Sequence, residues 1–126
     1  MPIHKLDHVN LRTTQLDAMI GWYMRVLGLQ VGARPNFPFP GAWLYAADTA
    51  VVHLIGVEGD SGAGSESDLK LEHFAFSATD LRAFEDRLRE LGEPHQLLDL
   101  ASFGLVQINL RDPDGNHLHV DFPGGP

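Results

Sequence analysis

The chain has 126 residues, of which nine are lysine or arginine and 17 are aspartate or glutamate, so its formal net charge is −8 at pH 7. This acidity argues against nucleic-acid binding, because proteins that bind the phosphate backbone carry basic surfaces. It also argues against binding to an anionic membrane surface. The absence of cysteine excludes disulfides, thiolate metal ligands and a cysteine nucleophile.

Length and hydropathy bound the architecture further. A chain of 126 residues fits one compact domain that can bury its own core. No apolar run approaches the roughly 20 residues that a membrane-spanning helix needs, and the first five residues hold no apolar segment of a signal peptide. We therefore expect a cytoplasmic protein.

The first predicted strand covers residues 6–11, where apolar and polar residues alternate. Alternation places every second side chain on the same face of a sheet. One face then carries His8, Asn10 and Arg12, and the other carries Val9 and Leu11. The polar face is the candidate functional face, and the apolar face is the one expected against a core.

A helix is predicted next, because apolar residues recur at helical spacing. They are Leu16, Met19, Ile20, Tyr23 and Leu27. Thr14 with Asp17 three residues on is a variant of the capping box that begins helices. Gly28 stands where a left-handed residue commonly ends them. The helix is thus expected to pack one apolar stripe against a sheet.

Three strand-like segments follow the helix, at about 29–34, 42–47 and 51–56. Residues 58–68 are rich in glycine, serine and acidic residues, which predicts a flexible, solvated linker.

The second half then repeats the first. Residues 71–76 show the order of residues 6–11: apolar, acidic, histidine, apolar, small or polar, apolar. A second helix begins at Thr79 or Asp80 and ends at Gly92, and its apolar stripe consists of Leu81, Phe84, Leu88 and Leu91. Strands are expected at about 95–98, 104–111 and 117–122. The last two are joined by a strong turn signal, Asp112-Pro113-Asp114-Gly115-Asn116.

Equivalent positions in the two halves keep nearly one spacing. His73 lies 65 residues after His8, Gly92 lies 64 after Gly28, and His119 lies 66 after His53. We therefore predict an α+β fold in which tandem βαβββ modules, at about 1–57 and 69–126, form a single domain. Each module is too small to be expected as an independent domain.

The motifs Leu6-Asp7-His8-Val9, Glu72-His73-Phe74 and the turn at 112–116 followed by His117-Leu118-His119 resemble the vicinal-oxygen-chelate superfamily, the group of glyoxalases, bleomycin-resistance proteins and extradiol dioxygenases. The resemblance covers nearly the whole chain. It implies a cupped, barrel-like mixed sheet with helices outside, a small-molecule substrate and a homodimer whose modules combine within or across chains. It does not select one chemistry, because one fold serves many activities.

The resemblance also implies a set of metal ligands from the first and last strands of each module. These are His8, His53, His73 and His119. The repeat supports the same four residues, because each half supplies an equivalent pair of histidines on predicted strands. For His53, a fourth ligand, a catalytic base and a pocket-wall residue all remain open.

His119 departs from the family pattern, since metal-dependent relatives usually carry glutamate there. Either His119 replaces that ligand, or Asp121 on the same strand face supplies a carboxylate. Because Asp121 lies roughly 6.6 Å further along the strand, we expect an accessory role for it.

Several other polar residues are candidate substrate contacts. Asn10, Arg12, Gln107 and Asn109 alternate onto the cup-facing sides of their strands, where they could bind polar substrate groups or bond at the barrel rim. His117 shares a face with His119 and could contact substrate, but a surface or dimer-interface position suits it better. His4 and His95 are expected at the surface.

An aromatic group is expected at the cup mouth. Its members are Phe37, Phe39, Trp43, Tyr45 and Phe103. The proline-rich segment 35–41 cannot be helical, so it forms either an aromatic lid over an apolar substrate or a packed connection.

These features favour a metal-dependent enzyme over a metal-free binding protein. Imidazole ligands suit Fe, Zn, Ni or Co, with Mn also possible, and the chemistry is either ring-cleaving and dioxygenase-like or that of a lyase or isomerase. His53 is the candidate base, since Glu72 alternates with His73 and is expected to point away from the cup. The alternative is small-molecule sequestration, as in drug-resistance members of the family. A glutathione substrate is disfavoured, because only Arg12, Arg34, Arg111 and Lys70 could bind its carboxylates.

Overall fold

The computed structural model describes residues 2–3, 5–60, 62 and 70–124. The chain divides into two compact units, Met1–Gly62 and Ala63–Pro126, each with its own four-stranded sheet. The division falls inside the predicted linker at 58–68. Most of that linker and His4 lie outside the described residues, and the single domain with module limits at 57 and 69 stays a prediction.

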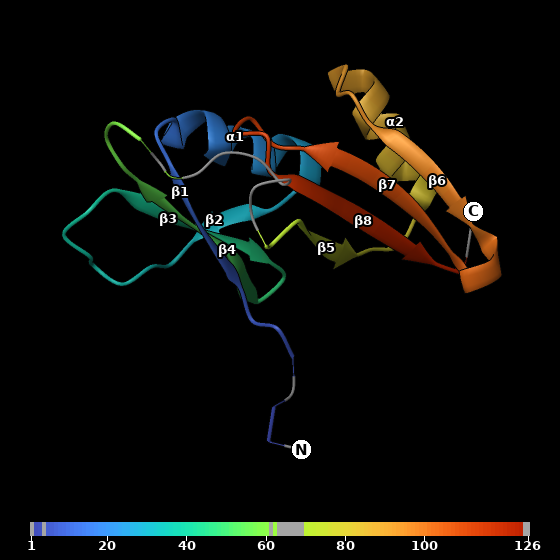
Figure 1. Cartoon of the computed structure of the whole chain (residues 1–126), viewed down its shortest axis with the longest axis horizontal. Helices are drawn as coiled ribbons and strands as arrows, with labels where there is room; N and C mark the ends of the chain where they lie inside the picture. Colours follow the sequence, from blue (N-terminus) through green and yellow to red (C-terminus); the bar gives the residue numbers. More distant parts are fainter. Residues whose placement is uncertain (1, 4, 61, 63–69, 125–126) are drawn as a thin grey trace. The chain divides into compact units, whose positions relative to one another are not determined.

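The first unit is a βαβββ module (Figure 1). Its elements are β1 (Val9–Thr13), α1 (Leu16–Leu27), β2 (Gln30–Gly32), β3 (Gly41–Ala46) and β4 (Thr49–Gly56). The sheet order is β1-β4-β3-β2, with β1 parallel to β4 and the other neighbours antiparallel. The crossover therefore brings the first and last strands of the module side by side.

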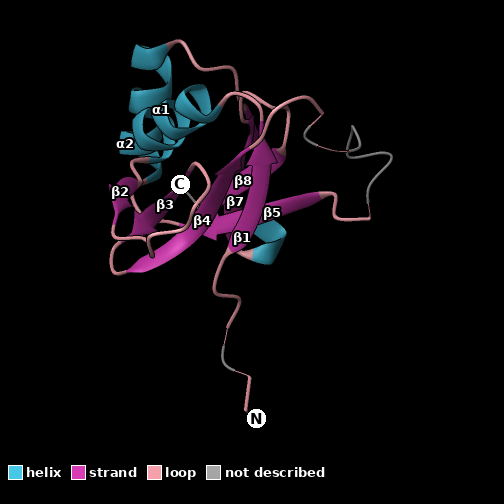
Figure 2. Cartoon of the chain, turned by 90° about the vertical axis from the view of Figure 1, so that its left-hand side faces the viewer, coloured by secondary structure: helices cyan, strands magenta, loops and turns pink. Residues whose placement is uncertain are grey.

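One face of this sheet packs against α1, which contacts β2, β3 and β4 (Figure 2). The buried residues on the two sides are Met19, Trp22, Tyr23 and Val26 of the helix and Ala42, Leu44, Val52 and Leu54 of the strands. Because side chains alternate along a strand, His53 between Val52 and Leu54 points to the opposite face. The core thus fixes which face carries the histidine.

The start of α1 differs from the prediction, while its end agrees. The residue that caps the helix is Gln15, without a side-chain capping bond, so the expected Thr14 cap is wrong. The hydroxyl that serves this turn belongs to Thr13, which is buried and whose Oγ1 accepts from the Gln15 N–H at 3.0 Å. Gly28 ends the helix in the left-handed region at φ 72°, as expected.

The second unit repeats the topology (Figure 1). Its elements are β5 (His73–Ser77), α2 (Leu81–Leu91), β6 (Gln96–Leu100), the 3₁₀ turn η1 (Ala101–Phe103), β7 (Leu105–Arg111) and β8 (His117–Pro123). The sheet order is β5-β8-β7-β6, with β5 parallel to β8. The predicted α+β class with two βαβββ modules is confirmed.

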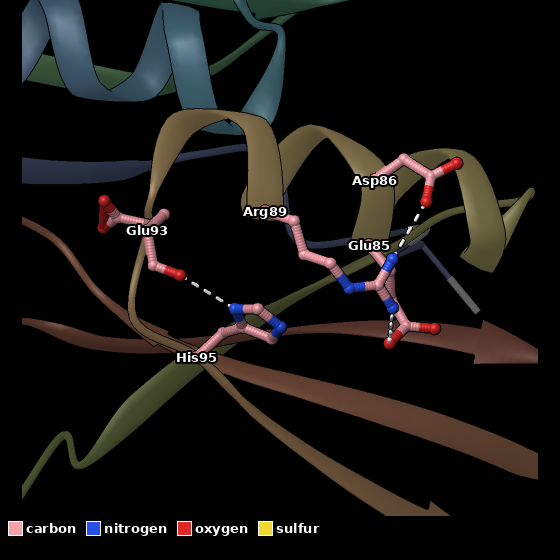
Figure 3. Close-up of polar contacts among 5 residues, drawn as sticks. All are labelled: Glu85, Asp86, Arg89, Glu93 and His95. Atoms are coloured by element: carbon pink, nitrogen blue, oxygen red, sulfur yellow. Dashed lines mark hydrogen bonds and ion pairs between the residues drawn. The ribbon is translucent and has the colours of Figure 1, made fainter.

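Local signals in this unit act as predicted. Asp80 begins α2, and its side chain accepts from the Ala83 N–H; Gly92 ends the helix at φ 64°. Arg89 on the outer side of α2 pairs with Glu85 and Asp86 (Figure 3). No helix in the described part of the chain is long and apolar enough to cross a membrane.

The predicted turn between β7 and β8 is built around one buried carboxylate. Asp112 Oδ1 accepts from the backbone N–H groups of Asp114 and Asn116, each at 3.0 Å, and its Oδ2 accepts from Asn116 Nδ2 at 2.9 Å. The turn thereby sets the register in which His117 lies opposite Arg111 and His119 opposite Asn109.

Candidate functional site

In the first unit, three aromatic rings stack in a row. The imidazoles of His8 and His53 have centroids 3.7 Å apart and planes 8° from parallel. The Trp43 ring covers the other side of His53, with a centroid distance of 4.0 Å. We call this set, Trp43–His53–His8, the ring stack.

The strand register explains the ring stack. Trp43 on β3 lies directly opposite His53 on β4, and Asn10 on β1 lies opposite His53 on the other side. His8 precedes β1 by one residue and reaches across to His53. Two predicted ligands, His8 and His53, are therefore brought together within one unit.

His53 is set up to stay neutral. Its residue is 8% exposed, and burial, with a smaller contribution from the neighbouring His8, lowers its pKa below the ordinary histidine value. Its Nε2–H donates to the carbonyl of Ala50 at 3.0 Å, so a metal or a proton would be bound through Nδ1. A neutral imidazole of this kind can act as a ligand or as a base.

In the second unit, three histidines converge on neighbouring strands. The ring centroid of His73 lies 4.7 Å from that of His119 and 5.2 Å from that of His117. The pairing of β5 with β8 is responsible, because it sets His73 opposite His117 and Ala75 opposite His119. Because the Ala75 side chain is small, it leaves room for the rings of His73 and His119 to approach each other.

Polar neighbours hold these rings in place. His119, which is 8% exposed, donates from Nδ1 to Asp121 Oδ1 at 2.7 Å. His117 donates from Nε2 to Asn109 Oδ1 at 2.7 Å, and Asn109 in turn donates to Gln107 Oε1 at 3.2 Å. The hydrogen bond from His119 to Asp121 is the contact by which an accessory carboxylate would orient the ring. On β7, Asn109 and Gln107 extend the hydrogen bonding that begins at His117.

In each unit an acidic residue directly precedes the histidine at the start of the first strand. His8 donates from Nδ1 to Asp7 at 2.8 Å, and His73 donates from Nδ1 to Glu72 at 2.9 Å. The hydrogen bond from His8 is the main reason that the pKa of Asp7 lies below its usual value. Strand alternation does not govern Glu72, because β5 begins only at His73, and the Glu72 carboxylate is therefore free to bond to the neighbouring ring.

The second unit holds a group of donor atoms close enough to share a divalent ion. Potential ligand atoms of Glu72, His73 and His117 lie within 4.8 Å of one another. The carboxylate contacts of His8, His73 and His119 leave Nε2 as the nitrogen that would bind a metal. Metal-binding histidines commonly have their other ring nitrogen held in this way.

The remaining predicted contacts are more spread out. Asn10 and Arg12 are exposed on β1, and Tyr45 is half-buried, its hydroxyl donating to the carbonyl of Ala33 at 2.6 Å. Phe103 on η1 is 77% exposed. His95 is half-buried outside both histidine clusters and donates from Nδ1 to the carbonyl of Glu93 (Figure 3).

The loop between β2 and β3 carries an arrangement that the sequence pattern did not indicate. Phe37 and Phe39 stack with centroids 5.1 Å apart, and the Arg34 guanidinium lies over both rings. The residues could have been noticed as one basic and two aromatic residues in a short proline-rich loop, but their contact depends on how that loop folds.

Comparison with known proteins agrees with this architecture. A family model described as the Glyoxalase/Bleomycin resistance protein/Dioxygenase superfamily matches residues 5–120. No curated protein sequence gives a significant match.

Three solved structures illustrate the fold. A glyoxylase/bleomycin resistance protein/dioxygenase domain from Frankia sp. EAN1pec has a TM-score of 0.78 and 21% identity, covering 96% of this chain and 98% of its own. A lactoylglutathione lyase from Agrobacterium tumefaciens has a TM-score of 0.71 and 19% identity, covering 97% and 96%. The fosfomycin resistance protein FosX from Listeria monocytogenes has a TM-score of 0.71 and 14% identity, covering 95% and 93%. From the family match over residues 5–120 and the paired βαβββ units, the chain belongs to the glyoxalase, bleomycin resistance protein and dioxygenase superfamily.

Proposed function

We propose that this protein is a divalent-metal-dependent enzyme acting on a small oxygenated organic molecule, and that its metal ligands come from His8, His53, His73 and His119. The observation that carries the proposal is the hydrogen bonding of the four histidines. Each of His8, His53, His73 and His119 has one ring nitrogen held by a carboxylate or a backbone carbonyl. Such contacts fix the tautomer and raise the basicity of the opposite nitrogen.

The ligand set favours late first-row metals. Four imidazoles suit Fe, Zn, Ni or Co better than Mg or Ca, and Mn is retained because Glu72 and Asp121 add oxygen donors nearby. The carboxylates that orient His8, His73 and His119 also place negative charge next to the cation. This compensates in part for the glutamate that His119 replaces.

A bound divalent ion would offer positions to two neighbouring substrate oxygens and stabilise the negative charge that develops on them. His53 is either the fourth ligand or the residue that moves a proton, because both roles use Nδ1 while Nε2 is held by Ala50. Its lowered pKa keeps it neutral, as either role requires. The reaction is either ring cleavage of the dioxygenase type or lyase or isomerase chemistry, and the name of the Agrobacterium lyase is in line with the second.

The test is metal content combined with substitution. We expect purified protein to bind a divalent ion, and His8→Ala, His73→Ala and His119→Ala each to lower the metal content strongly. His95→Ala is the matched control, because His95 lies outside both clusters. Equal metal content in all variants would contradict the proposal. Size-exclusion chromatography with light scattering, on the same samples, tests the homodimer that we also propose.

A metal-free sequestering function is the second candidate, and the ring stack favours it. Three parallel rings with spacings of 3.7 and 4.0 Å offer a flat aromatic surface on which a planar drug could stack. On this alternative, chelator-treated protein binds its ligand as tightly as metal-loaded protein, and Trp43→Ala weakens binding more than His119→Ala.

A further inference from the structure

Arg34 lies against a pair of stacked aromatic rings, those of Phe37 and Phe39. Its guanidinium carbon lies 5.1 Å from the ring centroid of Phe37 and 5.2 Å from that of Phe39. Its Nη2 donates to the carbonyl of Phe39 at 2.9 Å. Because the rings and the carbonyl fix the side chain in one position, little conformational entropy remains to be lost when a ligand binds there.

No carboxylate among the described residues forms an ion pair with Arg34. Arg89, by comparison, pairs with both Glu85 and Asp86. The guanidinium has five N–H donors, and Phe39 takes one of them, so the group retains donors in the fork geometry that matches a carboxylate.

Arg34 also lies next to the ring stack. A side chain built at Gly41 would meet Arg34 Nη2 at 2.9 Å, so the guanidinium rests directly against this glycine. Gly41 and Trp43 are two residues apart on β3, which is roughly 6.6 Å along a strand. The separation between the guanidinium and the ring stack is therefore comparable to the length of a small aromatic molecule.

We propose that Arg34 binds a carboxylate of the substrate, and that the substrate is therefore a small organic acid with an apolar or aromatic body. The inference rests on the proposed function and gives it a substrate class. The rings of Phe37 and Phe39, each 39% exposed, lie against the guanidinium and supply an apolar surface beside it. A charge-assisted hydrogen bond is stronger in such surroundings than in open solvent.

The competing explanation is purely structural: Arg34 would only tie the loop between β2 and β3 to Gly41. The two explanations differ in what they predict for ligands. A structural tie predicts a change in stability with no preference for acids. A carboxylate anchor predicts a preference for an acid over its neutral isostere that depends on the guanidinium.

The experiment compares benzoate with benzamide in NMR titrations of the isotope-labelled full chain, observing the Arg34 Nε–H signal. We expect wild type to bind benzoate about tenfold more tightly than benzamide, which is the size of one charge-assisted bond. Arg34→Gln should abolish this preference, and Arg34→Lys should keep part of it because the charge remains. Arg87→Gln, which removes an exposed arginine of α2, is the control and should keep it fully.

Titrations are run on metal-loaded and on chelator-treated protein, so that the two proposals fail separately. Absence of the preference in wild type, or its survival in Arg34→Gln, overturns the role of Arg34 whatever the metal content. A preference that depends on Arg34 in a protein that binds no metal supports the anchor and contradicts the metal enzyme. If Arg34→Gln does not fold, two other results test the proposal. A partly reduced preference in Arg34→Lys and a shift of the wild-type Arg34 Nε–H signal on adding benzoate support the anchor, and the absence of both contradicts it.

Discussion

The imidazole of His8 lies flat against that of His53, with centroids 3.7 Å apart. Two positive rings at this distance would repel each other, so the contact is stable only while at least one ring is neutral. His53 is that ring, because it is buried while His8 is more exposed. The stack thus ties the protonation of His53 to the stability of the first unit.

The first prediction is that metal-free protein loses stability as the pH falls below the ordinary histidine pKa of 6.5. The folded-state pKa of His53 lies lower, so in this range the unfolded chain takes up a proton that the folded chain does not, and unfolding is favoured. The measurement is Tm against pH in chelator-treated samples. His53→Gln should flatten the slope between neutral pH and the folded-state pKa, and an unchanged slope would contradict the assignment.

The second prediction concerns the start of α2. Asp80 accepts a hydrogen bond from the Ala83 N–H at 3.1 Å and adopts a left-handed conformation at φ 65°. Asp80→Ala should lower the free energy of unfolding by about 1 kcal/mol for the lost cap and by about as much again for the strained backbone. Asp80→Asn keeps both features and should be nearly neutral. Urea unfolding measures the two variants, and similar losses in both would be inconsistent with this account.

Much of the fold follows from local signals, which explains why it could be predicted. Gly28 and Gly92 end the two helices because only glycine adopts the required left-handed conformation without strain. Strand alternation places Val52 and Leu54 toward the core and His53 away from it. These relationships need only the spacing of residues along the chain.

The finer geometry of the candidate site depends on contacts that spacing does not encode. Glu72 turns toward His73 because the strand starts one residue later than the alternation suggested. The stack of His8 on His53 requires a particular choice of side-chain rotamers, and the position of Arg34 requires the fold of a proline-rich loop. Sequence patterns therefore located the histidines but not the groups that orient them.

The third prediction tests how tightly Gly41 is packed. A methyl group at Gly41 would collide with the backbone carbonyl oxygen of Leu54 and lie 2.9 Å from Arg34 Nη2. Gly41→Ala should therefore cost about 1–3 kcal/mol of unfolding free energy and displace the guanidinium. Gly56→Ala is the control, because its nearest neighbours are side-chain atoms at 3.2 and 3.3 Å that can move slightly. Equal losses for the two variants in denaturant titrations would argue against a close approach at Gly41.

The fourth prediction separates an orienting carboxylate from a direct ligand. Asp121 accepts from His119 Nδ1 at 2.7 Å, which holds the tautomer that presents Nε2 to a metal. Asp121→Asn removes the charge while keeping the shape, so metal affinity should fall about 10- to 100-fold, as expected for a group that acts through a ligand. Asp99→Asn, which changes an exposed aspartate of β6, should leave affinity unchanged. Competition titration with a chromogenic chelator measures the metal affinity of wild type and of the Asp121→Asn, Asp99→Asn and His119→Ala variants. A loss in Asp121→Asn as large as that in His119→Ala would instead make Asp121 a ligand in its own right, and no loss at all would remove it from the site.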